Sequence, residues 1–580
     1  MVNYQIYHTI KKEMNNNIVM DSRSEAIEFV IKSMKKGNTE VERIKLAAAR
    51  RFKLEKILRN SEIIARLSSH ERERLLPFLR KRPMRTASGV TPIAVMIRPE
   101  GSCPYSCIYC PTGLAAKSYT GFEPAALRAR QEDFDPVRQV RNRLKHYEEC
   151  GHPTDKCEII LMGGTFLRMP SSYKRLFVKG IYDGLNGKKS KNLQIAKKQN
   201  ETVHHRAIGL TIETRPDVCG KEEINEILEY GATRVELGVQ HPDDRIYKTI
   251  NRGHGTNDVI VATSLLKDSA FKVLYHLMPG LPGSNKTKDI SMVKRLFSDE
   301  RFRPDMLKIY PALVMSGTGL ELMANRGEYE PYNTEEAADV ISEFYRHIPS
   351  YVRVMRVQRD IPTGLIGKGV HNSNLRQFVE EMIKKKRIKS REIRSREIGI
   401  AGKGSELQEF KMKKTEYNAS GGKEVFLSFE NRKSIIAGFL RLRIGNEPFR
   451  KEIDESTALI RELHVYGSEM EIGKHGSHLI SPLASDRLPR APRVRHQEDA
   501  APTWPEGHGG PAIETSIARQ VAKSGVQHSG LGSDLLHEAE RLASEHFDKK
   551  RMIVISGVGA REYYKKQGYM PKGPYMAKKC

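Results

Sequence analysis

The sequence predicts an α/β protein in which a partial (β/α)6 barrel, similar to an incomplete TIM barrel, is followed by a smaller α/β domain and preceded by a basic helical region. Six short apolar runs between residues 93 and 310 alternate with helical stretches, as parallel strands joined by crossover helices do. Further apolar runs surround a glycine-rich turn near the end of the sequence. With 580 residues, the chain has room for about three such units.

The barrel strands are expected at the short apolar runs. These runs are residues 93–99, 158–162, 207–213, 234–240, 272–278 and 306–310, and helical stretches such as 222–230 and 257–268 separate them. In barrels of this type, chemistry takes place on the loops at the carboxyl ends of the strands. The candidate motifs all follow such ends: a cysteine loop, a Gly-Gly-Thr turn, Glu213, Gln240 and the turn at 279–283. We therefore expect a single active-site mouth.

Three cysteines directly after the first run, Cys103, Cys107 and Cys110, have the spacing C-x3-C-x2-C. Thiolates are the usual ligands of iron–sulfur clusters, and three of them leave one iron of a four-iron cluster without a protein ligand. A disulfide framework does not suit an odd number of cysteines in a long chain that has only seven. A zinc site needs a fourth ligand, and Cys150 and Cys157 follow at no recognised finger spacing. The spacing favours the cluster over zinc.

A second chemical feature lies near the end of the sequence. Gln527, Gly530 and Gly532 form a Q-x-x-G-x-G turn before an amphipathic stretch whose apolar residues recur at helical spacing. Strands are expected before the turn at 426–429, 434–444 and 459–466, and after it at 551–556. A glycine-rich turn at a helix N-terminus directs unpaired N–H groups at one point and forms an anion cradle. Considered alone, such a turn is more often an ordinary helix start, and the strands around it favour the anion cradle.

The barrel motifs resemble the radical S-adenosylmethionine (SAM) superfamily, whose members bind a 4Fe–4S cluster through C-x3-C-x2-C and hold SAM on its open iron. The resemblance implies both cofactors, with the three cysteines as metal ligands. Gly163, Gly164 and Thr165 match the family's glycine-rich motif after the second strand, where a side chain would block the approach of the backbone to the cofactor. Glu213 and Gln240 are candidate cofactor contacts, although polar residues at strand ends are also often simple caps.

The last part of the sequence resembles the GNAT acetyltransferase fold, in which the Q-x-x-G-x-G turn holds the pyrophosphate of acetyl-CoA. A radical SAM barrel and a GNAT domain in one chain, with M-G-G-T-F, I-E-T-R-P-D, R-E-L-H-V-Y-G and I-S-G-V-G-x-R-x-Y-Y, resemble the Elongator protein 3 family of tRNA-modifying enzymes. The resemblance runs from about Arg80 to Tyr575 and is interrupted once. It implies that acetyl-CoA supplies carbon to C5 of the wobble uridine, so that the product is 5-carboxymethyluridine in tRNA.

The same resemblance implies the residues that bind acetyl-CoA. It marks Lys156 in the barrel and, in the second domain, Glu462, Leu463, His464, Val465, Gln527, Gly530, Leu531, Gly532, Ser533 and Tyr564. We expect Lys156, Tyr563 and Tyr564 to act in catalysis, because a phenol can donate a proton to the departing thiolate. Simpler interpretations exist for each. Period two alone puts Glu462 and His464 on a solvated strand face, one of the two tyrosines must face the core, and Lys156 can be a surface charge.

The positive charge of the chain suits an RNA substrate. Lysine and arginine number 98 against 71 acidic residues, which gives a net charge of +27, and such an excess usually signals affinity for polyanions. Basic residues recur at 43–59, 80–85, 353–359 and 384–387, and neutralisation of phosphates is the main source of nucleic-acid affinity. The wobble base must also be splayed out and held in a pocket, by residues that the sequence does not reveal.

Four units are expected along the chain. They are a basic helical tRNA-binding region at 1–80, the barrel at 81–390, a linker at 391–419 and the acetyltransferase domain at 420–580. A stretch at about 474–520, rich in Pro, Gly, His and Arg, departs from the family and is expected to be a disordered loop or a partner-binding element. Family members often have a cysteine where this chain has Ser390, so the sequence does not favour an additional zinc site.

The opening residues are polar, and no apolar run approaches the ~20 residues of a membrane helix, so we expect neither a secretory signal nor a membrane span. Free thiols and an oxygen-sensitive cluster indicate a reducing cytoplasm. A homodimer and a complex with accessory subunits are both compatible with the sequence. Two other functions also remain. A protein-lysine acetyltransferase would use only the second domain and would not need Cys107, and a basic RNA-binding module would need neither Cys107 nor Tyr564.

Overall fold

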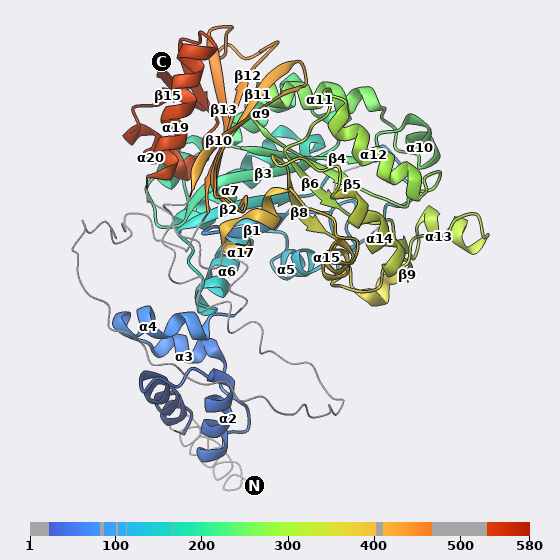
Figure 1. Ribbon diagram of the computed structural model, residues 1–580. Helices are drawn as coiled ribbons and strands as arrows, with labels where there is room; N and C mark the ends of the chain where they lie inside the picture. Colours follow the sequence, from blue (N-terminus) through green and yellow to red (C-terminus); the bar gives the residue numbers. More distant parts are fainter. Residues whose placement is uncertain are drawn as a thin grey trace, which may run out of the picture.

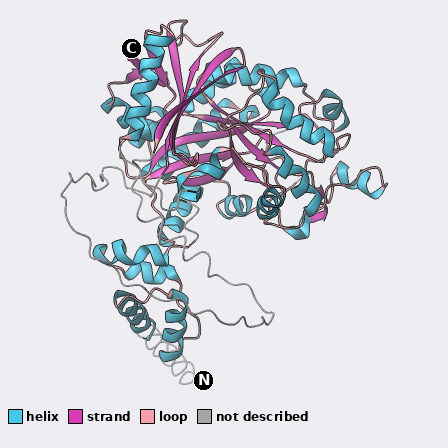
Figure 2. Ribbon diagram, in the orientation of Figure 1, coloured by secondary structure: helices cyan, strands magenta, loops and turns pink. Residues whose placement is uncertain are grey.

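The computed structural model describes residues 22–81, 86, 88–99, 103–111, 113–164, 166–401, 410–466 and 530–580. Thr165, Gln527 and the stretch at about 474–520 lie outside the described residues. The described chain forms a small helical lobe near the N-terminus and a larger body that contains both large sheets (Figure 1). Within that body, helices surround the strands (Figure 2).

The first sheet of the larger body consists of seven parallel strands, in the order β1-β2-β3-β4-β5-β6-β8. They are β1 (Thr91–Met96), β2 (Lys156–Met162), β3 (Arg206–Thr214), β4 (Arg234–Gln240), β5 (Lys272–Leu277), β6 (Met306–Ile309) and β8 (Arg353–Val357). β1 and β8 are its two edges, so this barrel is incomplete. The predicted partial α/β barrel is confirmed, and β8 is one strand more than the six expected.

Helices cover the outer face of the parallel sheet (Figure 1). The helices of this part of the chain are α5 (Pro124–Gln131), α6 (Pro136–Glu149), α7 (Ser171–Asn186), α8 (Leu193–Asn200), α9 (Lys221–Tyr230), α10 (Asp244–Thr249), α11 (Thr256–Asp268), α12 (Lys286–Ser298), α13 (Gly319–Asn325), α14 (Thr334–Phe344) and α15 (Leu375–Lys385), of which α13 stands away from the sheet. Side chains fix several of their starts: Asn285 accepts from the backbone N–H of Lys288 at α12, and Asn333 with Glu336 forms a capping box at α14. A small two-stranded sheet, β7 (Val314–Met315) and β9 (Ile366–Lys368), lies beyond β6.

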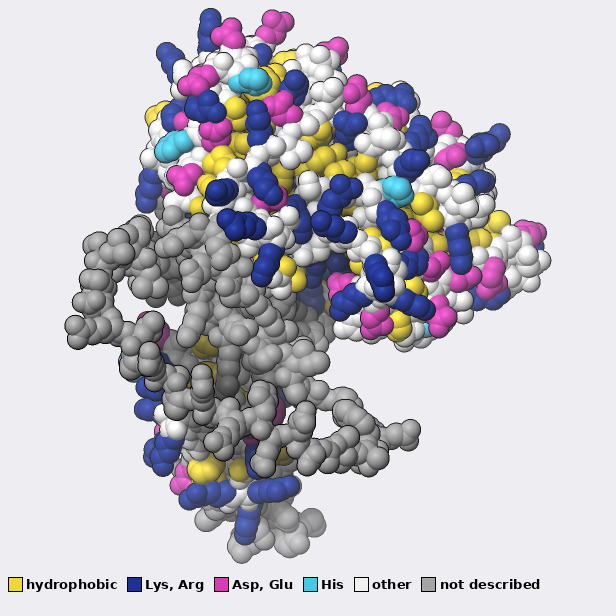
Figure 3. Space-filling view, in the orientation of Figure 1, with side chains coloured by type: hydrophobic (Ala, Val, Ile, Leu, Met, Phe, Trp, Pro, Cys, Tyr) yellow, Lys and Arg dark blue, Asp and Glu magenta, His cyan; other side chains and the backbone are white. Residues whose placement is uncertain are grey.

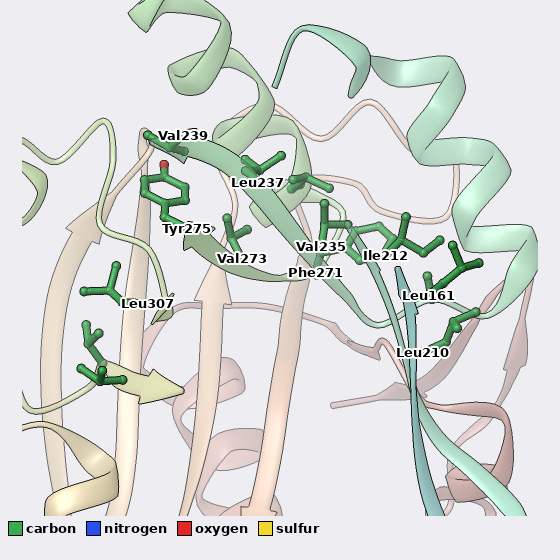
Figure 4. Packing of buried hydrophobic residues seen from close by; sticks show 14 of the residues in the cluster. Leu161, Leu210, Ile212, Val235, Leu237, Val239, Phe271, Val273, Tyr275 and Leu307 are labelled. Carbon is green, nitrogen blue, oxygen red and sulfur yellow. The ribbon is translucent and has the colours of Figure 1, made fainter. Parts of the chain in front are cut away.

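Side-chain alternation along the strands separates an apolar outer layer from a polar interior. On β4, Val235, Leu237 and Val239 are buried in the hydrophobic core, together with Leu161, Leu210, Ile212, Phe271, Val273, Tyr275 and Leu307 from the neighbouring strands (Figure 4). The intervening β4 residues, Arg234, Glu236, Gly238 and Gln240, instead line a cavity inside the barrel. The barrel interior is therefore built for polar contacts rather than for a closed apolar core.

The second sheet has the order β10-β11-β12-β13-β14-β16-β15 and is antiparallel except between β13 and β14. Its strands are β10 (Lys411–Ala419), β11 (Gly422–Glu430), β12 (Ile436–Ile444), β13 (Thr457–Val465), β14 (Arg551–Val554), β15 (Met570–Lys572) and β16 (Tyr575–Lys579). Helices α19 (Leu531–Arg541) and α20 (Arg561–Lys566) accompany them. Pairing between β13 and β14 stops at Ile460 and Val554, although β13 continues to Val465. β14 ends at Val554, so the last residues of β13 extend beyond it.

Buried charges join the second sheet to the barrel. Arg461 of β13 donates to both carboxylate oxygens of Asp305, which precedes β6, at 2.6 and 2.7 Å, and also to Glu424 at 2.8 Å. Arg443 of β12 donates to Asp268, at the end of α11, at 2.8 Å. These side chains are almost fully buried. One hydrophobic core also runs continuously through both units, so barrel and second sheet form one body.

The N-terminal lobe has a hydrophobic core of its own. It consists of helical residues 22–35, α2 (Val41–Arg51), α3 (Asn60–Arg66) and α4 (Ser69–Leu79). Most basic residues between 43 and 59 are exposed, but Lys45 is buried and donates to Glu42 and Asn60 at 2.9 Å, so it is not part of the basic surface. The lobe contacts the larger body where Arg80 donates to the carbonyl oxygen of Gly151 at 2.8 Å.

The described part of the stretch expected to be a linker, 391–419, contains two short helices and a strand. They include α16 (Ile393–Arg396) and α17 (Ile398–Ala401). α16 packs against β8, and the backbone N–H of Ile393 donates to the carbonyl oxygen of Val352, which precedes β8. β10 begins at Lys411 and belongs to the second sheet. Its strand signal was weak in the sequence because most of its side chains are polar and exposed. No helix in the described ranges is long and apolar enough to cross a membrane.

Candidate active site inside the barrel

A cavity of about 850 Å³ occupies the barrel interior. It reaches from the cysteine loop, at the carboxyl ends of the strands, to Arg353 and Glu397 at the amino-terminal side. Alternate residues of the strands line it, among them Glu158, Ile160 and Met162 on β2, His276 on β5, Lys308 on β6, and Arg353 and Met355 on β8. The predicted mouth is thus one end of a polar cavity that extends along the strands.

The cysteine loop forms the upper end of the cavity, and Cys103, Cys107 and Cys110 all line it. The backbone N–H of Cys110 donates to the carbonyl oxygen of Cys107 at 2.9 Å, which closes the loop into a turn. The guanidinium of Arg252 lies 3.6 Å from the Cys107 sulfur, and that of Arg215 lies 4.0 Å from it. Two guanidinium groups therefore lie close enough to compensate the negative charge of a Cys107 thiolate. Neither arginine was predicted from the sequence as a site residue.

The three sulfurs do not converge on one point. They are not among the described donor groups whose atoms all lie within 4.8 Å of one another, as the ligands of a single ion do. A four-iron cluster takes each thiolate on a different iron, so it needs a wider arrangement. All three are free cysteines in the structure. The donor set therefore fits a cluster better than one zinc ion.

The two glycines after β2 have different surroundings. Gly163 has φ +132°, and a Cβ atom there would lie 2.7 Å from Cγ1 of Ile97, so this position accepts only glycine without strain. A Cβ on Gly164 would have no heavy atom within 4 Å, and Gly164 lines the cavity. Gly164 thus leaves open space beside the cysteine loop, as the approach of a cofactor to the backbone requires.

Gln240 and Glu213 both reach the cavity from strand ends. Gln240 has φ +65°, which is uncommon for a residue with a side chain, and its buried Oε1 has no hydrogen-bond partner in the described structure. Glu213 accepts from the Tyr119 hydroxyl at 2.7 Å and from the backbone N–H of Gly163 at 3.4 Å. Burial and the Glu213 carboxylate raise the pKa of Tyr119 well above its ordinary value.

Below these residues lies an ionic cluster that the sequence analysis did not identify. The Nε2 atom of His276 is 2.8 Å from Oε2 of Glu236, and the ammonium of Lys308 contacts the same carboxylate and lies 3.8 Å from Glu213. Burial opposes ionisation of Glu236, but Lys308 and His276 outweigh it and hold the pKa of its carboxyl far below the ordinary value. Side-chain alternation along each expected strand could have indicated these residues, because it separates the side chains that face the barrel interior from those that face the apolar outer layer.

Arginines of β8 and of α16, the short helix after the barrel, lie on one side of the cavity. Arg353 donates to Glu397 at 2.5 Å and to the Tyr466 hydroxyl of the second domain at 2.6 Å. Arg356 pairs with Asp360 at 3.1 Å and is half exposed. Burial and the nearby Arg376 and Arg353 lower the pKa of Arg394, which also lines the cavity. This side of the cavity therefore carries concentrated positive charge.

In the second domain, several expected acetyl-CoA residues converge on the N-terminus of α19. Gly530 has φ +93° and caps the helix, and the backbone N–H of Ser533 donates back to its carbonyl oxygen at 2.9 Å. A Cβ on Gly532 would lie 3.1 Å from the Tyr563 hydroxyl and 3.6 Å from Cγ2 of Val465. Leu531 starts the helix in the same place. The helix start, the end of β13 and α20 therefore meet where β13 extends beyond β14.

Four other expected residues are placed differently. Glu462 pairs with Arg441 at 2.8 Å, and His464 stacks on Phe439, so both side chains are partly buried against the second sheet and not on a solvated face. Burial lowers the pKa of His464. Tyr564 is buried, whereas Tyr563 remains 37% exposed. Leu463 is partly buried against the hydrophobic core. This strand segment therefore offers a ligand its backbone, together with the side chain of Val465.

Lys156 lies at the amino end of β2, opposite to the cysteine loop. It is the register partner of Arg206 on β3, against which Gly559 of the second domain packs closely. Lys156 is therefore near the junction of the two units and does not line the described cavity. Thr165 and Gln527 lie outside the described residues. Ser390 forms a hydroxyl pair with Ser395 at 2.9 Å, which is not a zinc donor set.

Known proteins with similar sequences and structures identify the family. Models of the ELP3 N-terminal domain, the Radical SAM superfamily and the Radical_SAM C-terminal domain match residues 20–87, 98–296 and 304–385. The tRNA uridine(34) acetyltransferase of Methanocaldococcus jannaschii is 43% identical over 97% of this chain and 99% of its own length. Elongator complex protein 3 of Mus musculus is 36% identical over 97% of both chains.

The chain belongs to the Elongator protein 3 family. A solved structure of the archaeal Methanocaldococcus infernus Elp3 with an N-terminal deletion gives a TM-score of 0.69 at 42% identity and covers 85% of this chain and 100% of that one. The barrel is a radical SAM domain, and such a domain uses a 4Fe–4S cluster and SAM. In this Elongator protein 3 family member, the cysteine loop, its two arginines and the open space at Gly164 fit these two groups.

Proposed function

We propose that this protein converts the wobble uridine of tRNA to 5-carboxymethyluridine with SAM and acetyl-CoA. The proposal depends mainly on one observation. A cysteine-lined polar cavity shares one body with a helix N-terminus suited to an anion, in a chain 43% identical over 97% of its length to a tRNA uridine(34) acetyltransferase. Neither unit alone would account for this combination.

In the barrel, Cys103, Cys107 and Cys110 would hold the cluster, and Gly164 and Gln240 would contact SAM. When bound, these two cofactors supply a radical able to take hydrogen from the methyl group of an acetyl thioester. The protein must then exclude other C–H bonds and fix the acceptor ring, because such a radical attacks whatever lies nearest. A cavity enclosed by strands on most sides supports this role.

Acetyl-CoA would bind where α19, β13 and α20 meet. The α19 N-terminus offers the backbone N–H groups at its start and the positive end of the helix dipole to the pyrophosphate. Gly532 leaves room for that approach, and the Tyr563 hydroxyl lies beside it, so we assign the thiolate-facing role to Tyr563 rather than to the buried Tyr564. Lys156, at the junction of the units, would meet the thioester end of the cofactor.

The tRNA would bind across the basic surface. Exposed basic residues lie on the N-terminal lobe, and Arg356 of β8 lines the cavity and is half exposed. Lys and Arg side chains also gather on the visible face of the larger body (Figure 3). A net charge of +27 supports phosphate contacts along an RNA of many nucleotides. We place the enzyme in the cytoplasm and expect either a homodimer or accessory subunits, as the name of the mouse relative suggests for that protein.

One anaerobic experiment tests the proposal. Reduced, cluster-loaded protein is incubated with tRNA, SAM and acetyl-CoA, and the nucleosides are then analysed by mass spectrometry. We expect a mass gain that matches carboxymethyl on uridine, and its dependence on each of the three additions. Acetylated lysine with unmodified RNA would instead support a protein-lysine acetyltransferase and overturn the proposal.

A further inference from the structure

The His276–Glu236 pair in the barrel interior has the composition of a proton-transfer dyad. Glu236 is completely buried, whereas His276 is 15% exposed and lines the cavity. Their contact uses Nε2 of the ring, and no described residue makes a hydrogen bond to the other ring nitrogen, Nδ1. One nitrogen is thus fixed by a carboxylate, and the other is available to a molecule in the cavity.

The charge state of Glu236 decides which ring nitrogen carries the proton. A carboxylate only accepts hydrogen bonds, so Nε2 of His276 must donate to it. In the neutral ring, Nδ1 then has a lone pair and is the basic nitrogen. A carboxylate that orients an imidazole in this way also stabilises the imidazolium that forms when the ring takes a proton.

The dyad lies close to the cofactor end of the cavity. A continuous set of contacts leads from Gly163 through Glu213 and Lys308 to Glu236 and His276. Single donor atoms of Glu213, Glu236 and His276 lie within 4.8 Å of one another. A group held against the glycine turn can therefore reach the dyad without leaving the cavity.

A metal ion is not the best explanation of this cluster. The Lys308 ammonium contacts Glu236 and lies 3.8 Å from Glu213, so a fixed cation already occupies the place between the two carboxylates. A purely structural ion-pair network is not sufficient either. Oε1 of Glu236 and Nε of Arg234 form an ion pair at 3.5 Å, but both atoms are buried and make no hydrogen bond in the described structure. Unsatisfied buried groups beside a cavity indicate that a polar molecule belongs there.

We propose that His276 is the general base that hydrolyses the thioester remaining after the acetyl carbon has bonded to the uracil ring. The inference rests on the proposed function. Nδ1 of His276 takes a proton from water as the water oxygen bonds to the thioester carbonyl carbon. The carbon–sulfur bond then breaks, and the sulfur leaves as CoA thiolate and receives that proton. Uridine-5-acetate and CoA are the products, so no oxidant or reductant is needed.

Lys308 has a second role in this step. Its ammonium lines the cavity and is held by Glu236 and Glu213, so it stands beside the dyad with its charge fixed. A cation in this position stabilises the oxyanion that develops on the carbonyl oxygen when water attacks. Burial opposes its charge, but Glu236 outweighs burial and raises the pKa of Lys308, so the lysine stays charged.

The test separates hydrolysis from radical formation. His276→Gln keeps an N–H that can donate to Glu236 but provides no base. In the complete anaerobic reaction, we expect this variant to form 5′-deoxyadenosine at near the wild-type rate and to accumulate a tRNA–CoA adduct joined through the thioester. Release of 5-carboxymethyluridine should fall by about 10²-fold or more, the usual contribution of a general base. Equal losses of deoxyadenosine and modified nucleoside would mean a merely structural role and would overturn the inference.

A second assay does not depend on radical chemistry. Synthetic (uracil-5-yl)acetyl-CoA is offered to the cluster-loaded protein without SAM, and free CoA is measured. We expect hydrolysis by the wild type and a loss of about 10²-fold in His276→Gln, with a smaller loss in Glu236→Gln, which removes the orienting carboxylate. Wild-type protein that leaves this thioester intact would overturn the inference, even if the tRNA is modified. Failure of tRNA modification with hydrolysis intact would reject the proposed function instead.

His205→Gln is the matched control. His205 also lies near a carboxylate, with Nε2 3.5 Å from Glu148, and its Nδ1 is 3.0 Å from the carbonyl oxygen of Thr154, but it does not line the cavity. We expect this variant to match the wild type in both assays. Adduct accumulation in His205→Gln would show that the effect is not specific to the dyad.

Discussion

Among single residues, Gly163 and Gly164 show how neighbours in the sequence can serve different purposes. Both match one motif, yet Gly163 is required by backbone conformation and close packing, while Gly164 faces open space in the cavity. Sequence alone could not separate these roles, because the difference lies in what surrounds each Cα. Alanine substitutions at the two positions therefore make a matched pair.

We expect Gly163→Ala to destabilise the fold by about 1–3 kcal/mol, because the new methyl group would meet Ile97 and φ is +132°. Gly164→Ala should change stability by no more than about 0.5 kcal/mol. It should nevertheless lower SAM affinity by about 10-fold or more, since the methyl group enters the cofactor space. Thermal denaturation and equilibrium binding of SAM to the cluster-loaded protein measure the two effects. Normal SAM affinity in Gly164→Ala would remove this glycine from the cofactor site.

Cys107 is the best residue for testing the cluster, because it is buried beside Arg215 and Arg252. We expect Cys107→Ser to lose iron–sulfur absorbance and 5′-deoxyadenosine formation after anaerobic reconstitution, and to keep acetyl-CoA binding in the second domain. Cys580→Ser, which changes an exposed cysteine at the far end of the chain, is the control and should behave as the wild type. A variant that retained full cluster absorbance would contradict the assignment of the ligands.

At the level of secondary-structure elements, the sequence was most informative where apolar runs were continuous. All six expected barrel strands are present, but β8 was missed, because Val354 and Val357 alternate with arginines that were interpreted only as a basic cluster. The interior residues Glu236, His276 and Lys308 lie within correctly predicted strands. They lie inside their strands, whereas the motifs in the sequence mark only strand ends. Their grouping depends on strand register, which the sequence does not contain.

The α19 N-terminus provides a prediction for the second site. Gly532→Val would place branched carbons against the Tyr563 hydroxyl and Val465, at the point where the pyrophosphate is proposed to approach. We expect acetyl-CoA affinity to fall by about 10-fold or more, with cluster content and acetyl-CoA-independent SAM cleavage unchanged. Ser544→Ala, an exposed change at the far end of the same helical segment, should leave affinity unaltered. Isothermal titration calorimetry measures the acetyl-CoA affinity of each variant. Wild-type affinity in Gly532→Val would exclude the turn from the acetyl-CoA site.

For the whole molecule, the ionic interface explains how two catalytic units can keep a fixed relation. Arg461 is bound to Asp305 of the barrel, and the next residue along β13 begins the segment assigned to acetyl-CoA. The residue that forms the ion pair with the barrel and the segment proposed to bind acetyl-CoA thus belong to the same strand, β13. Any motion of the acetyl-CoA site relative to the barrel would have to break buried charge pairs, which is costly when either partner is left unpaired.

Asp305→Asn tests this coupling. It removes one of the two carboxylates that compensate the buried Arg461 and Lys267 and leaves only Glu424, so we expect a loss of about 3–5 kcal/mol in the free energy of unfolding at pH 7. Glu328→Gln removes an exposed ion pair with Arg326 and should cost less than about 1 kcal/mol. Chemical denaturation followed by circular dichroism gives both values. Near-equal stabilities of the two variants would show that the interface does not depend on Asp305.

The pH dependence of stability gives an independent check. Burial opposes ionisation of Asp305, but Arg461 and Lys267 outweigh it, so its folded-state pKa is lowered. The stabilisation is then fully present above the unfolded pKa of about 3.9 and is lost as pH falls below it. We expect the wild-type melting temperature to fall between about pH 5 and pH 2, and to fall less steeply in Asp305→Asn, which has no carboxylate to protonate. Parallel curves for the two proteins would mean that other carboxylates control acid unfolding and that the two units are not held together mainly through this aspartate.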